Sequence, residues 1–593
     1  MLKKPNVVFI LTDDQGYGDL GCHGNTIVKT PNIDRFYDES MRLTDYHVGP
    51  TCAPTRAGLL TGHYANSTGV WHTIGGRSLL RKDEYTMANM FSDAGYQTGL
   101  FGKWHLGDSY PFRPEDRGFR EVVRHGGGGV GNTPDYWEND YFDDTYCANG
   151  VWTKYPGYCT DVWFDLGIDF IQRHKDKPFF CYIATNAPHV PHIVDPEYSD
   201  PYLPPVSPSE SRARYYGMLA NIDENFGVLC DKLREWNLED DTILVFMTDN
   251  GSHGGVDVDA DQFVTSGHNS GMRGKKGSQY DGGHRVPFFI RWPTGGLVGG
   301  RDVEELTANV DIMPTLMELC RLGDSSQMGF DGTSLISLLE VDIPKKSPEK
   351  PVGTGWEDRI VVTDSQRLAN PVKWRKSSAM SSRWRLIDGS ELYDMLLDSG
   401  QAIDVAADHP EEVRRLRLAY EYWWNKVTER VDENIPFEIG VGEGIQVLVN
   451  SHDWRNVEDP ACVWNQCQVR QGLAHNGYWE IDIVRAGAYT FDLRRWPREA
   501  NLGLNDGIEG TPQVDFGEMT YEVRHTGGKA LPITAAELEV GGQYQSQQVK
   551  KGQLSAKFTM QLEAGSTILR TRLYNDEGFG LGAYYVYIKF EKP

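Results

Sequence analysis

Two short apolar segments each end in a pair of side-chain oxygen donors. Residues 6–11 (NVVFIL) and 242–247 (TILVFM) are rich in β-branched residues, which is typical of buried strands. The donors that follow them are Asp13 and Asp14 in one case and Asp249 and Asn250 in the other. One such pair alone is more often a turn or a helix cap. Two pairs beyond the carboxyl ends of parallel strands can converge on one hard divalent cation, which prefers these ligands.

A third segment, residues 51–62 (TCAPTRAGLLTG), has a cysteine two residues before a proline and four before an arginine. This pattern often arises by chance, and a lone cysteine is usually a small buried hydrophobe. Together with the oxygen donors, however, it resembles the signature of the sulfatase branch of the alkaline phosphatase superfamily. The resemblance implies that a formylglycine-generating enzyme oxidises Cys52 to formylglycine. It also implies one calcium ion, with magnesium allowed by the ligand chemistry, held by Asp13, Asp14, Cys52, Asp249 and Asn250.

Three further segments match this family position by position: residues 102–107 (GKWHLG), 187–192 (APHVPH) and 273–283 (RGKKGSQYDGG). The resemblance places four of their side chains around the formylglycine and the sulfate: Lys103, His105, His189 and Lys276. Lys275 competes with Lys276, and only the register with the Gly-Gly turn separates them. Many relatives carry glutamate where this chain has Asp281.

The resemblance also implies a mechanism. One hydroxyl of the hydrated aldehyde attacks sulfur and expels the substrate alcohol; deprotonation of the other collapses the diol, which releases sulfate and regenerates the aldehyde. Arg56 and Lys103 are expected to brace the hydroxyls, and the cation to lower the pKa of the attacking one. His105 is expected to be the base, because the usual pKa of histidine lies near neutrality. His189 and Lys276 are expected to bind sulfate and assist the leaving oxygen.

The substrate is less well defined by the sequence. The family resemblance implies a sulfated small molecule or glycan, with artificial aryl sulfates also cleaved. Arg77 and His268 are candidate substrate-binding residues, and the loop at residues 125–132 (HGGGGVGN) is either a substrate loop or a plain connection. Two alternatives remain open: a phosphomonoester or phosphonate hydrolase of the same superfamily, and a non-catalytic glycan-binding protein.

The 593 residues exceed what one hydrophobic core normally serves, so we expect several domains. The fold class expected is α/β: an alkaline-phosphatase-like, mixed but mainly parallel sheet flanked by helices (residues 1–345). A small antiparallel α+β subdomain (346–437), which includes strands at 359–362 and 384–387, and a C-terminal β-sandwich (438–593) follow. Residues 87–94 and 211–236 are expected to be connecting helices, and residues 341–356 a linker.

The C-terminal sandwich is predicted to be a structural appendage that packs on the catalytic domain. The alternative is glycan binding through exposed tryptophans, for which the candidates are Trp454, Trp464, Trp479 and Trp496.

A formal net charge of −25 argues against a nucleic-acid partner, and it requires local cations if the substrate is an anion. No apolar run is long enough to span a membrane, so no membrane partner is expected. The start, MLKKP, leads directly into the first strand without a secretory leader. The sequence as written predicts a cytoplasmic protein, or a periplasmic or secreted one if a leader has been removed. Nothing in the sequence predicts the oligomeric state.

Overall fold

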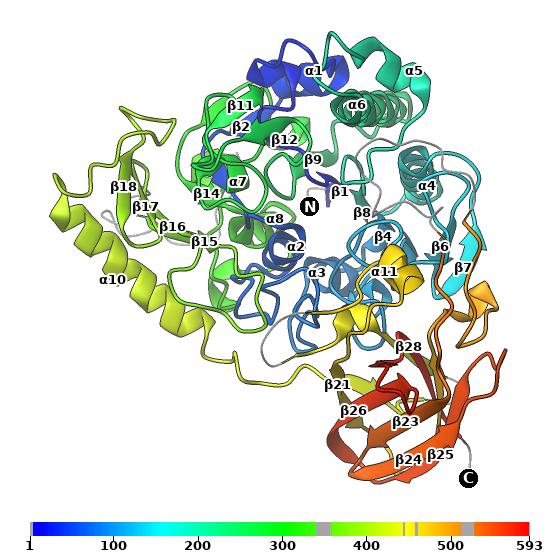
Figure 1. Cartoon of the computed structure of the whole chain (residues 1–593). Helices are drawn as coiled ribbons and strands as arrows, with labels where there is room; N and C mark the ends of the chain where they lie inside the picture. Colours follow the sequence, from blue (N-terminus) through cyan, green and yellow to red (C-terminus); the bar gives the residue numbers. More distant parts are fainter. Residues whose placement is uncertain are drawn as a thin grey trace.

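The computed structural model describes residues 4–339, 356, 359–442, 445–456, 461–510 and 527–591. Its largest element is a ten-stranded mixed sheet, coloured from blue to green in Figure 1. In spatial order the strands are β13 (Asp302–Val303), β2 (Met41–Leu43), β12 (Phe288–Arg291), β9 (Thr242–Thr248), β1 (Asn6–Thr12), β8 (Phe179–Ala184), β4 (Gln97–Gly102), β5 (Glu121–Arg124), β6 (Thr145–Ala148) and β7 (Val151–Lys154).

The centre of this sheet is parallel. Strand β1 pairs in parallel with β9 on one side and β8 on the other, β8 pairs with β4, and β4 with β5. Thr12 lies opposite Thr248, so the residues that follow β1 and β9 emerge at the same edge. The antiparallel strands lie outward of this parallel core. This confirms the expected mixed, mainly parallel α/β class.

Helices cover both faces of the sheet (Figure 1). Val7, Phe9 and Leu11 of β1 pack into one core, and Val8 and Ile10 pack into the other. This alternation follows from the two-residue period of a strand. Helices α2 (Cys52–Thr61), α3 (Met87–Asp93) and α8 (Ile312–Leu319) contribute to the first core. Helices α1 (Pro31–Glu39), α4 (Cys159–His174) and α6 (Glu210–Glu235) contribute to the second. The helices expected near residues 87–94 and 211–236 are therefore confirmed.

A separate four-stranded antiparallel sheet consists of β15 (Val361–Asp364), β16 (Ser377–Met380), β17 (Trp384–Ile387) and β18 (Glu391–Asp394). Helix α10 (Pro410–Val427) packs on it through Leu416, Tyr420 and Trp423. The strands expected near residues 359–362 and 384–387 thus belong to one small α+β unit. The expected linker at 341–356 lies outside the described residues except for Trp356, and the three-domain division stays a prediction.

The C-terminal part forms two packed, mainly antiparallel sheets, coloured yellow to red in Figure 1, as expected for a sandwich. One contains β19 (Phe437–Ile439), β21 (Tyr478–Ile483), β26 (Gly565–Tyr574), β23 (Ala535–Val540), β24 (Gln543–Gln548) and β27 (Gly580–Leu581). The other contains β20 (Gln446–Asn450), β28 (Tyr585–Phe590), β22 (Gly487–Arg494) and β25 (Ala556–Leu562). Within the first sheet, β19 pairs with β21 in parallel.

The tryptophans of the sandwich are core residues. Trp454, Trp479 and Trp496 are fully buried, and Trp464 is partly buried against the same core. Trp496 also packs edge-on against Trp137, which precedes the sandwich in the chain, with ring centroids 5.4 Å apart. The alternative that glycans stack on these three tryptophans is therefore wrong, because other residues of the chain cover the faces of their rings.

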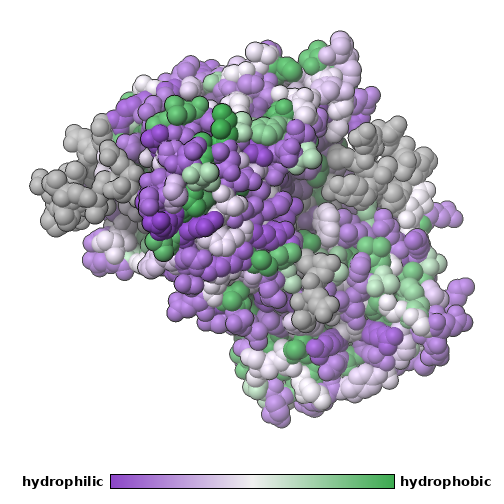
Figure 2. Space-filling model, turned by 60° about the vertical axis from the view of Figure 1, so that its left-hand side comes forward, coloured by the Kyte–Doolittle hydropathy of each residue, from purple (hydrophilic) through white to green (hydrophobic). Residues whose placement is uncertain are grey.

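Small elements complete the fold. They are α5 (Pro196–Ser199), α7 (Asp281–His284), α9 (Ile336–Leu339), α11 (Gln466–Gln471), and the strand pairs β3 (Tyr46–His47) with β14 (Thr307–Ala308) and β10 (Val256–Val258) with β11 (Val264–Gly267). None of the described helices is long and apolar enough to cross a bilayer. The face of the molecule in Figure 2 is mainly hydrophilic, with hydrophobic side chains in small separate groups.

The end of β4 requires a glycine. Gly102 has φ +111°, and a Cβ there would lie 1.9 Å from the carbonyl oxygen of Ala184 in β8. We therefore expect Gly102→Ala to lower the free energy of unfolding by at least about 2 kcal/mol, because it adds both backbone strain and a steric clash. Denaturant unfolding of the purified variant measures this loss.

Gly95 provides the matched control, because its φ is +83° but a Cβ there would meet nothing within 4 Å. Gly95→Ala should cost only about 1 kcal/mol, from backbone strain alone. Equal losses at the two positions would contradict the steric argument.

Candidate functional site

The two predicted oxygen-donor pairs meet at the carboxyl edge of the central sheet. Asp13, Asp14, Asp249 and Asn250 are all completely buried. The backbone N–H of Asp14 donates to Asp249 Oδ1 at 3.2 Å, and Asn250 Nδ2 donates to Asp14 Oδ1 at 2.9 Å. The parallel register of β1 and β9 brings these residues together although more than two hundred positions separate them.

Asp14 has a left-handed backbone, with φ +68°, which is uncommon for a residue other than glycine. Three contacts hold this conformation: its carbonyl oxygen accepts from the Tyr215 hydroxyl (3.0 Å) and from the backbone N–H of His253 (3.1 Å), and its own N–H donates to Asp249. Strain of this kind persists where the surrounding structure fixes it and is concentrated at functional sites.

Each of the three acids is paired with one of the predicted cationic side chains. The pairs are Lys103–Asp13 (2.6 Å), Lys276–Asp14 (2.6 Å) and Arg56–Asp249 (2.7 Å). All six side chains are at least nine-tenths buried. Buried charges need such partners, since desolvation without one is costly. The Lys276 contact also separates it from its competitor Lys275, because it is Lys276 that reaches Asp14.

Cys52 is the first residue of α2, whose side chains are all buried. Its Sγ and carboxylate oxygens of Asp13 and Asp249 lie within 4.8 Å of one another. Arg56, one turn further along α2, donates to Asp249 through Nε and Nη2. The helix therefore places residue 52 and the arginine of the signature next to the acids at the sheet edge.

This donor set fits a divalent cation. Asp13 Oδ1 and Asn250 Oδ1 are buried, and in the described part of the chain they have no hydrogen-bond partner. Buried oxygens of this kind require an explanation, and a bound ion supplies one. Burial and then the Asp249 charge raise the pKa of Asp13 well above its usual range, a shift that a cation beside it would reverse. Burial alone would raise the pKa of Asp14 too, but Lys276 and His189 hold it well below its usual range.

His105 and His189 each use one ring nitrogen in a bond to a backbone carbonyl and leave the other ring nitrogen free of such a bond. His105 Nε2 lies 2.9 Å from the carbonyl oxygen of Thr73, which can only accept, so Nδ1 carries the free electron pair. Among the described residues that Nδ1 has no partner. His189 Nδ1 likewise donates to the Val190 carbonyl (2.7 Å) and leaves Nε2 3.7 Å from Asp14 Oδ2. Burial and then Lys103 lower the pKa of His105 well below its usual value, so this ring is neutral at pH 7.

The glycine-rich loop at 125–132 packs against both histidines. A Cβ on Gly128 would lie 2.3 Å from the His105 ring, and one on Gly129 would lie 3.4 Å from His189. The glycines therefore permit the loop to approach the site closely, which favours a substrate loop over a plain connection.

The two predicted substrate-binding residues lie in other contacts. Arg77 donates to the carbonyl oxygen of Ala369 at 2.9 Å and stacks over Trp71. His268 Nε2 lies 3.0 Å from the carbonyl oxygen of His23. Within the described ranges no hydrogen bond or ion pair joins either residue to the acids or to Cys52, so their role in binding stays a prediction.

Two residues near the site carry no sequence signal that could have identified them. His452, in the C-terminal part, is buried with its ring centroid 6.3 Å from that of His105, and the backbone N–H of Gly75 donates to its carbonyl oxygen. Arg367 is exposed beside the small sheet, and together with burial its charge opposes the rise in the pKa of Lys276 that Asp14 causes. Both come from regions outside the family motifs.

Comparisons with known proteins agree with this geometry. The Sulfatase family model matches residues 5–322, more than half of the chain. Steryl-sulfatase of Rattus norvegicus is 27% identical over 416 residues, covering 56% of this chain and 70% of the rat protein. N-acetylgalactosamine-6-O-sulfatase of Bacteroides thetaiotaomicron is 28% identical over 502 residues, covering 70% of this chain and 92% of that protein. The chain spans about half (54%) of Arylsulfatase J of Mus musculus, at 30% identity.

Solved structures share the fold. Ps i-CgsB, solved in complex with k-i-k-neocarrahexaose, has a TM-score of 0.60 and 26% identity, and covers 71% of this chain and 93% of its own. PsFucS1 sulfatase from Pseudoalteromonas sp. shares the fold, with a TM-score of 0.56 at 19% identity over 73% of this chain and 92% of its own. The chain therefore belongs to the sulfatase family of sulfuric ester hydrolases.

Proposed function

We propose that this protein hydrolyses sulfate monoesters with a formylglycine at position 52 and one divalent cation, Ca²⁺ in the first instance. The observation that carries the proposal is the convergence of Cys52 with Asp13 and Asp249 within 4.8 Å at the carboxyl edge of the sheet. The proposed ligands are residue 52, Asp13, Asp14, Asp249 and Asn250, an oxygen-rich set that suits a hard cation. When bound, the ion supplies charge that lowers the pKa of the attacking hydroxyl and polarises the sulfate.

The charges of the site favour an anionic substrate. Three carboxylates face three cationic side chains, so the buried pairs are neutral as a group. A divalent cation added to this neutral set makes the site positive. A net charge of −25 on the whole chain is thus compatible with sulfate binding, because the nearest charges dominate the field in a buried site.

The residues then take separate roles. Arg56 and Lys103 orient the hydroxyls at position 52, and His105 Nδ1 accepts the proton that is lost when sulfate leaves. His189 and Lys276 hold the sulfate oxygens and the leaving oxygen. The bond from sulfur to the substrate oxygen breaks in the first step, and the bond from sulfate to residue 52 breaks in the second, so water is the only reagent consumed.

A sulfated carbohydrate is the proposed natural substrate, and aryl sulfates are proposed to be cleaved as well. N-acetylgalactosamine-6-O-sulfatase of Bacteroides thetaiotaomicron supports this class, because it aligns with 70% of this chain. Maturation would need a formylglycine-generating enzyme as a transient partner. A panel of sulfated mono- and oligosaccharides, assayed with the converted protein, tests the proposed substrate class.

Cys52→Ala is expected to abolish turnover of an aryl sulfate, because the variant has no precursor of the nucleophile. Assays should use protein that was co-produced with a formylglycine-generating enzyme, with intact-mass analysis of the Cys52 peptide to establish conversion. Folding should be preserved, since an alanine fits where a buried cysteine was. Aryl sulfatase activity of the variant at the level of the native protein would refute the assignment.

To test the reaction class, the rate of hydrolysis of an aryl sulfate is compared with that of an aryl phosphate with the same leaving group. We expect the converted protein to cleave the sulfate faster, because one cation with several cationic side chains suits a singly charged ester, whereas a two-metal site suits phosphate. Faster cleavage of the phosphate would favour a phosphomonoester or phosphonate hydrolase instead.

Removing the cation should remove activity reversibly. A chelator is expected to lower the rate by roughly a hundredfold or more, since loss of one charge-stabilising donor alone costs that much. Added Ca²⁺ should restore the rate.

Asp13→Asn should weaken Ca²⁺ binding in calorimetry, whereas Glu411→Gln, at an exposed position of α10, should not. Full activity in the chelator would exclude a cation-dependent reaction.

His105→Ala should separate the two steps. Without its base the variant is expected to release about one equivalent of alcohol per converted chain and then to stall. Rapid-mixing kinetics with a chromogenic aryl sulfate measures this burst. The lowered pKa of His105 also predicts that the native rate is retained as the pH falls through 6.5, the usual histidine value, and declines only below it. A variant slowed equally in both phases would assign His105 a different role.

A further inference from the structure

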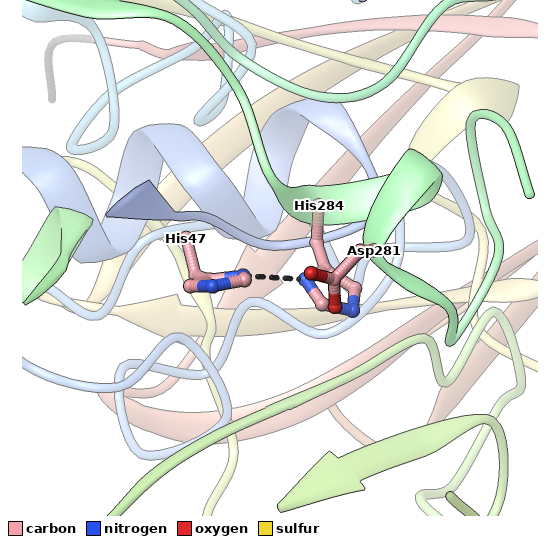
Figure 3. A group of neighbouring side chains, drawn as sticks. All are labelled: His47, Asp281 and His284. Atoms are coloured by element: carbon pink, nitrogen blue, oxygen red, sulfur yellow. Dashed lines mark hydrogen bonds between the residues drawn. The ribbon is translucent and has the colours of Figure 1, made fainter. Parts of the chain in front are cut away.

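A second group of buried donors lies away from Cys52. It consists of His47 in β3 and of Asp281 and His284, the two ends of the short helix α7. All three side chains are almost completely buried, and a potential ligand atom of each lies within 4.8 Å of the other two. Figure 3 shows the two imidazole rings facing each other with the Asp281 carboxylate beside His284.

The hydrogen bonds of the two histidines fix where their ring protons are. His47 Nε2 lies 2.9 Å from Asp45 Oδ1, and His284 Nε2 lies 3.1 Å from the carbonyl oxygen of Gln279. Both of these oxygens only accept, so each Nε2 must carry a hydrogen. The Nδ1 atoms of the neutral rings then both carry free electron pairs, and they face each other at 2.9 Å.

Two facing electron pairs at this distance require a positive charge between them. A shared proton would satisfy the two nitrogens, but it would do nothing for Asp281. Asp281 Oδ2 is buried without a hydrogen-bond partner among the described residues, and the Arg285 guanidinium is 4.0 Å away. A metal ion in this position would satisfy both nitrogens and the carboxylate together.

We propose that His47, His284 and Asp281 bind one divalent transition-metal ion of the Zn²⁺ type. Two histidine nitrogens and one carboxylate oxygen form a usual ligand set for this class of ion, with a water molecule in the fourth position. Nitrogens on a tetrahedral Zn²⁺ lie about 3.3 Å apart, so the two rings need to separate by only a few tenths of an ångström. Asp45 and Gln279 orient the ligands from the far side of each ring, as the outer partners of metal-bound histidines do.

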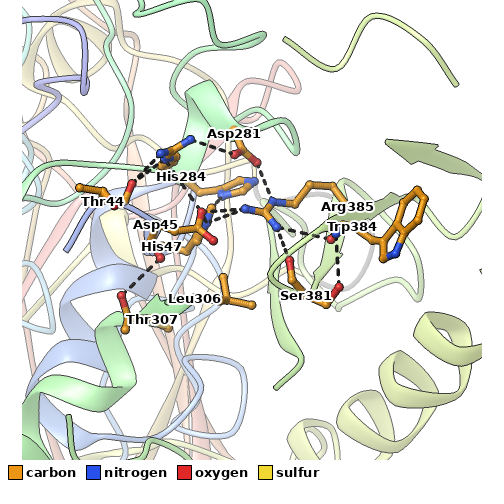
Figure 4. A network of polar contacts seen from close by, with 12 residues as sticks. Thr44, Asp45, His47, Asp281, His284, Leu306, Thr307, Ser381, Trp384 and Arg385 are labelled. Atoms are coloured by element: carbon orange, nitrogen blue, oxygen red, sulfur yellow. Dashed lines mark hydrogen bonds and ion pairs between the residues drawn. The ribbon is translucent and has the colours of Figure 1, made fainter. Parts of the chain in front are cut away.

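Two neighbouring arginines lower the affinity of this site for a metal ion, but they do not prevent the ion from binding. Figure 4 shows Arg385 between the two carboxylates: its Nε donates to Asp281 Oδ1 (3.2 Å) and its Nη2 to Asp45 Oδ1 (2.7 Å). The same Nη2 lies 3.4 Å from His47 Nε2. Arg285 lies 4.0 Å from both carboxylates. The two arginines balance the two acids, so binding depends on the ligand bonds rather than on net attraction.

The proposed ion would lie between segments that are close to the Cys52 site in the chain. Helix α7 begins five residues after Lys276, and β3 lies shortly before Cys52 in the chain. Arg385 belongs to β17 of the small four-stranded sheet. An ion between β3 and α7 would therefore tie two segments of the catalytic part together at the point where the small sheet contacts them. The proposal does not depend on which reaction the Cys52 site catalyses.

Metal analysis of the full chain tests the site. Protein produced without added metal is dialysed against buffered Zn²⁺ and then against metal-free buffer, and its zinc is measured by mass spectrometry. The Cys52→Ala variant is treated in the same way, because an unconverted Cys52 thiol with Asp13 and Asp249 offers a competing site. We expect about one Zn²⁺ per chain in Cys52→Ala, a further Zn²⁺ in the native protein only where its Cys52 thiol is unconverted, and at least a tenfold lower content in Cys52→Ala/His284→Gln.

Cobalt gives a second readout that needs no further mutation. Co²⁺ bound by Cys52→Ala should show the intense visible absorption of a four-coordinate nitrogen–oxygen site, and Zn²⁺ should displace it. This measurement keeps the test decisive if the double variant does not fold. Absence of stoichiometric zinc and of this spectrum in Cys52→Ala would overturn the proposal and leave a shared proton between the histidines. Equal zinc content in Cys52→Ala/His284→Gln, folded as judged by circular dichroism, would overturn it as well.

Discussion

Three buried carboxylate–cation pairs determine how the catalytic centre is built. Each acid comes from the end of β1 or β9, and each cation comes from a different segment: α2, the turn after β4, and the loop before α7. Breaking one buried pair by removing a partner typically costs about 3–5 kcal/mol, because the other charge stays desolvated. The pairs therefore hold five distant segments at one edge of the sheet and leave Asp13 Oδ1 and Asn250 Oδ1 available to an ion.

The parts of the chain beyond the family match also contribute to this centre. The buried His452 lies next to His105, and the segment around it bonds to the turn at Gly75. Leu79, Phe112 and Trp137 of the catalytic part belong to the same core as the sandwich. From the small unit, Arg385 reaches the acids next to β3 and α7. The sandwich thus packs on the rest of the molecule, as expected of an appendage, and its role stays a prediction.

Much of the site could be predicted because its residues are constrained locally. The oxygen donors directly follow apolar runs, and the cysteine has a fixed spacing from an arginine. Each motif can therefore be recognised from a few adjacent residues, and the structure brings the motifs together. The partner of each acid could not be predicted, because Lys103, Lys276 and Arg56 reach their acids across 90 to 262 positions. His452 and Arg367 belong to no recognisable motif, because only tertiary packing brings them near the site. Trp479 allows two interpretations from the sequence, because an alternating strand pattern does not tell which aromatic faces are covered.

The most direct test of the central claim is a crystal structure of the converted protein with the anomalous scattering of the bound cation. The account predicts one cation peak about 2.3–2.6 Å from oxygens of Asp13, Asp14, Asp249 and Asn250, with formylglycine at position 52 in its coordination sphere. A converted protein in which these four side chains surround no ion, or in which residue 52 points away from it into the core, would contradict the account.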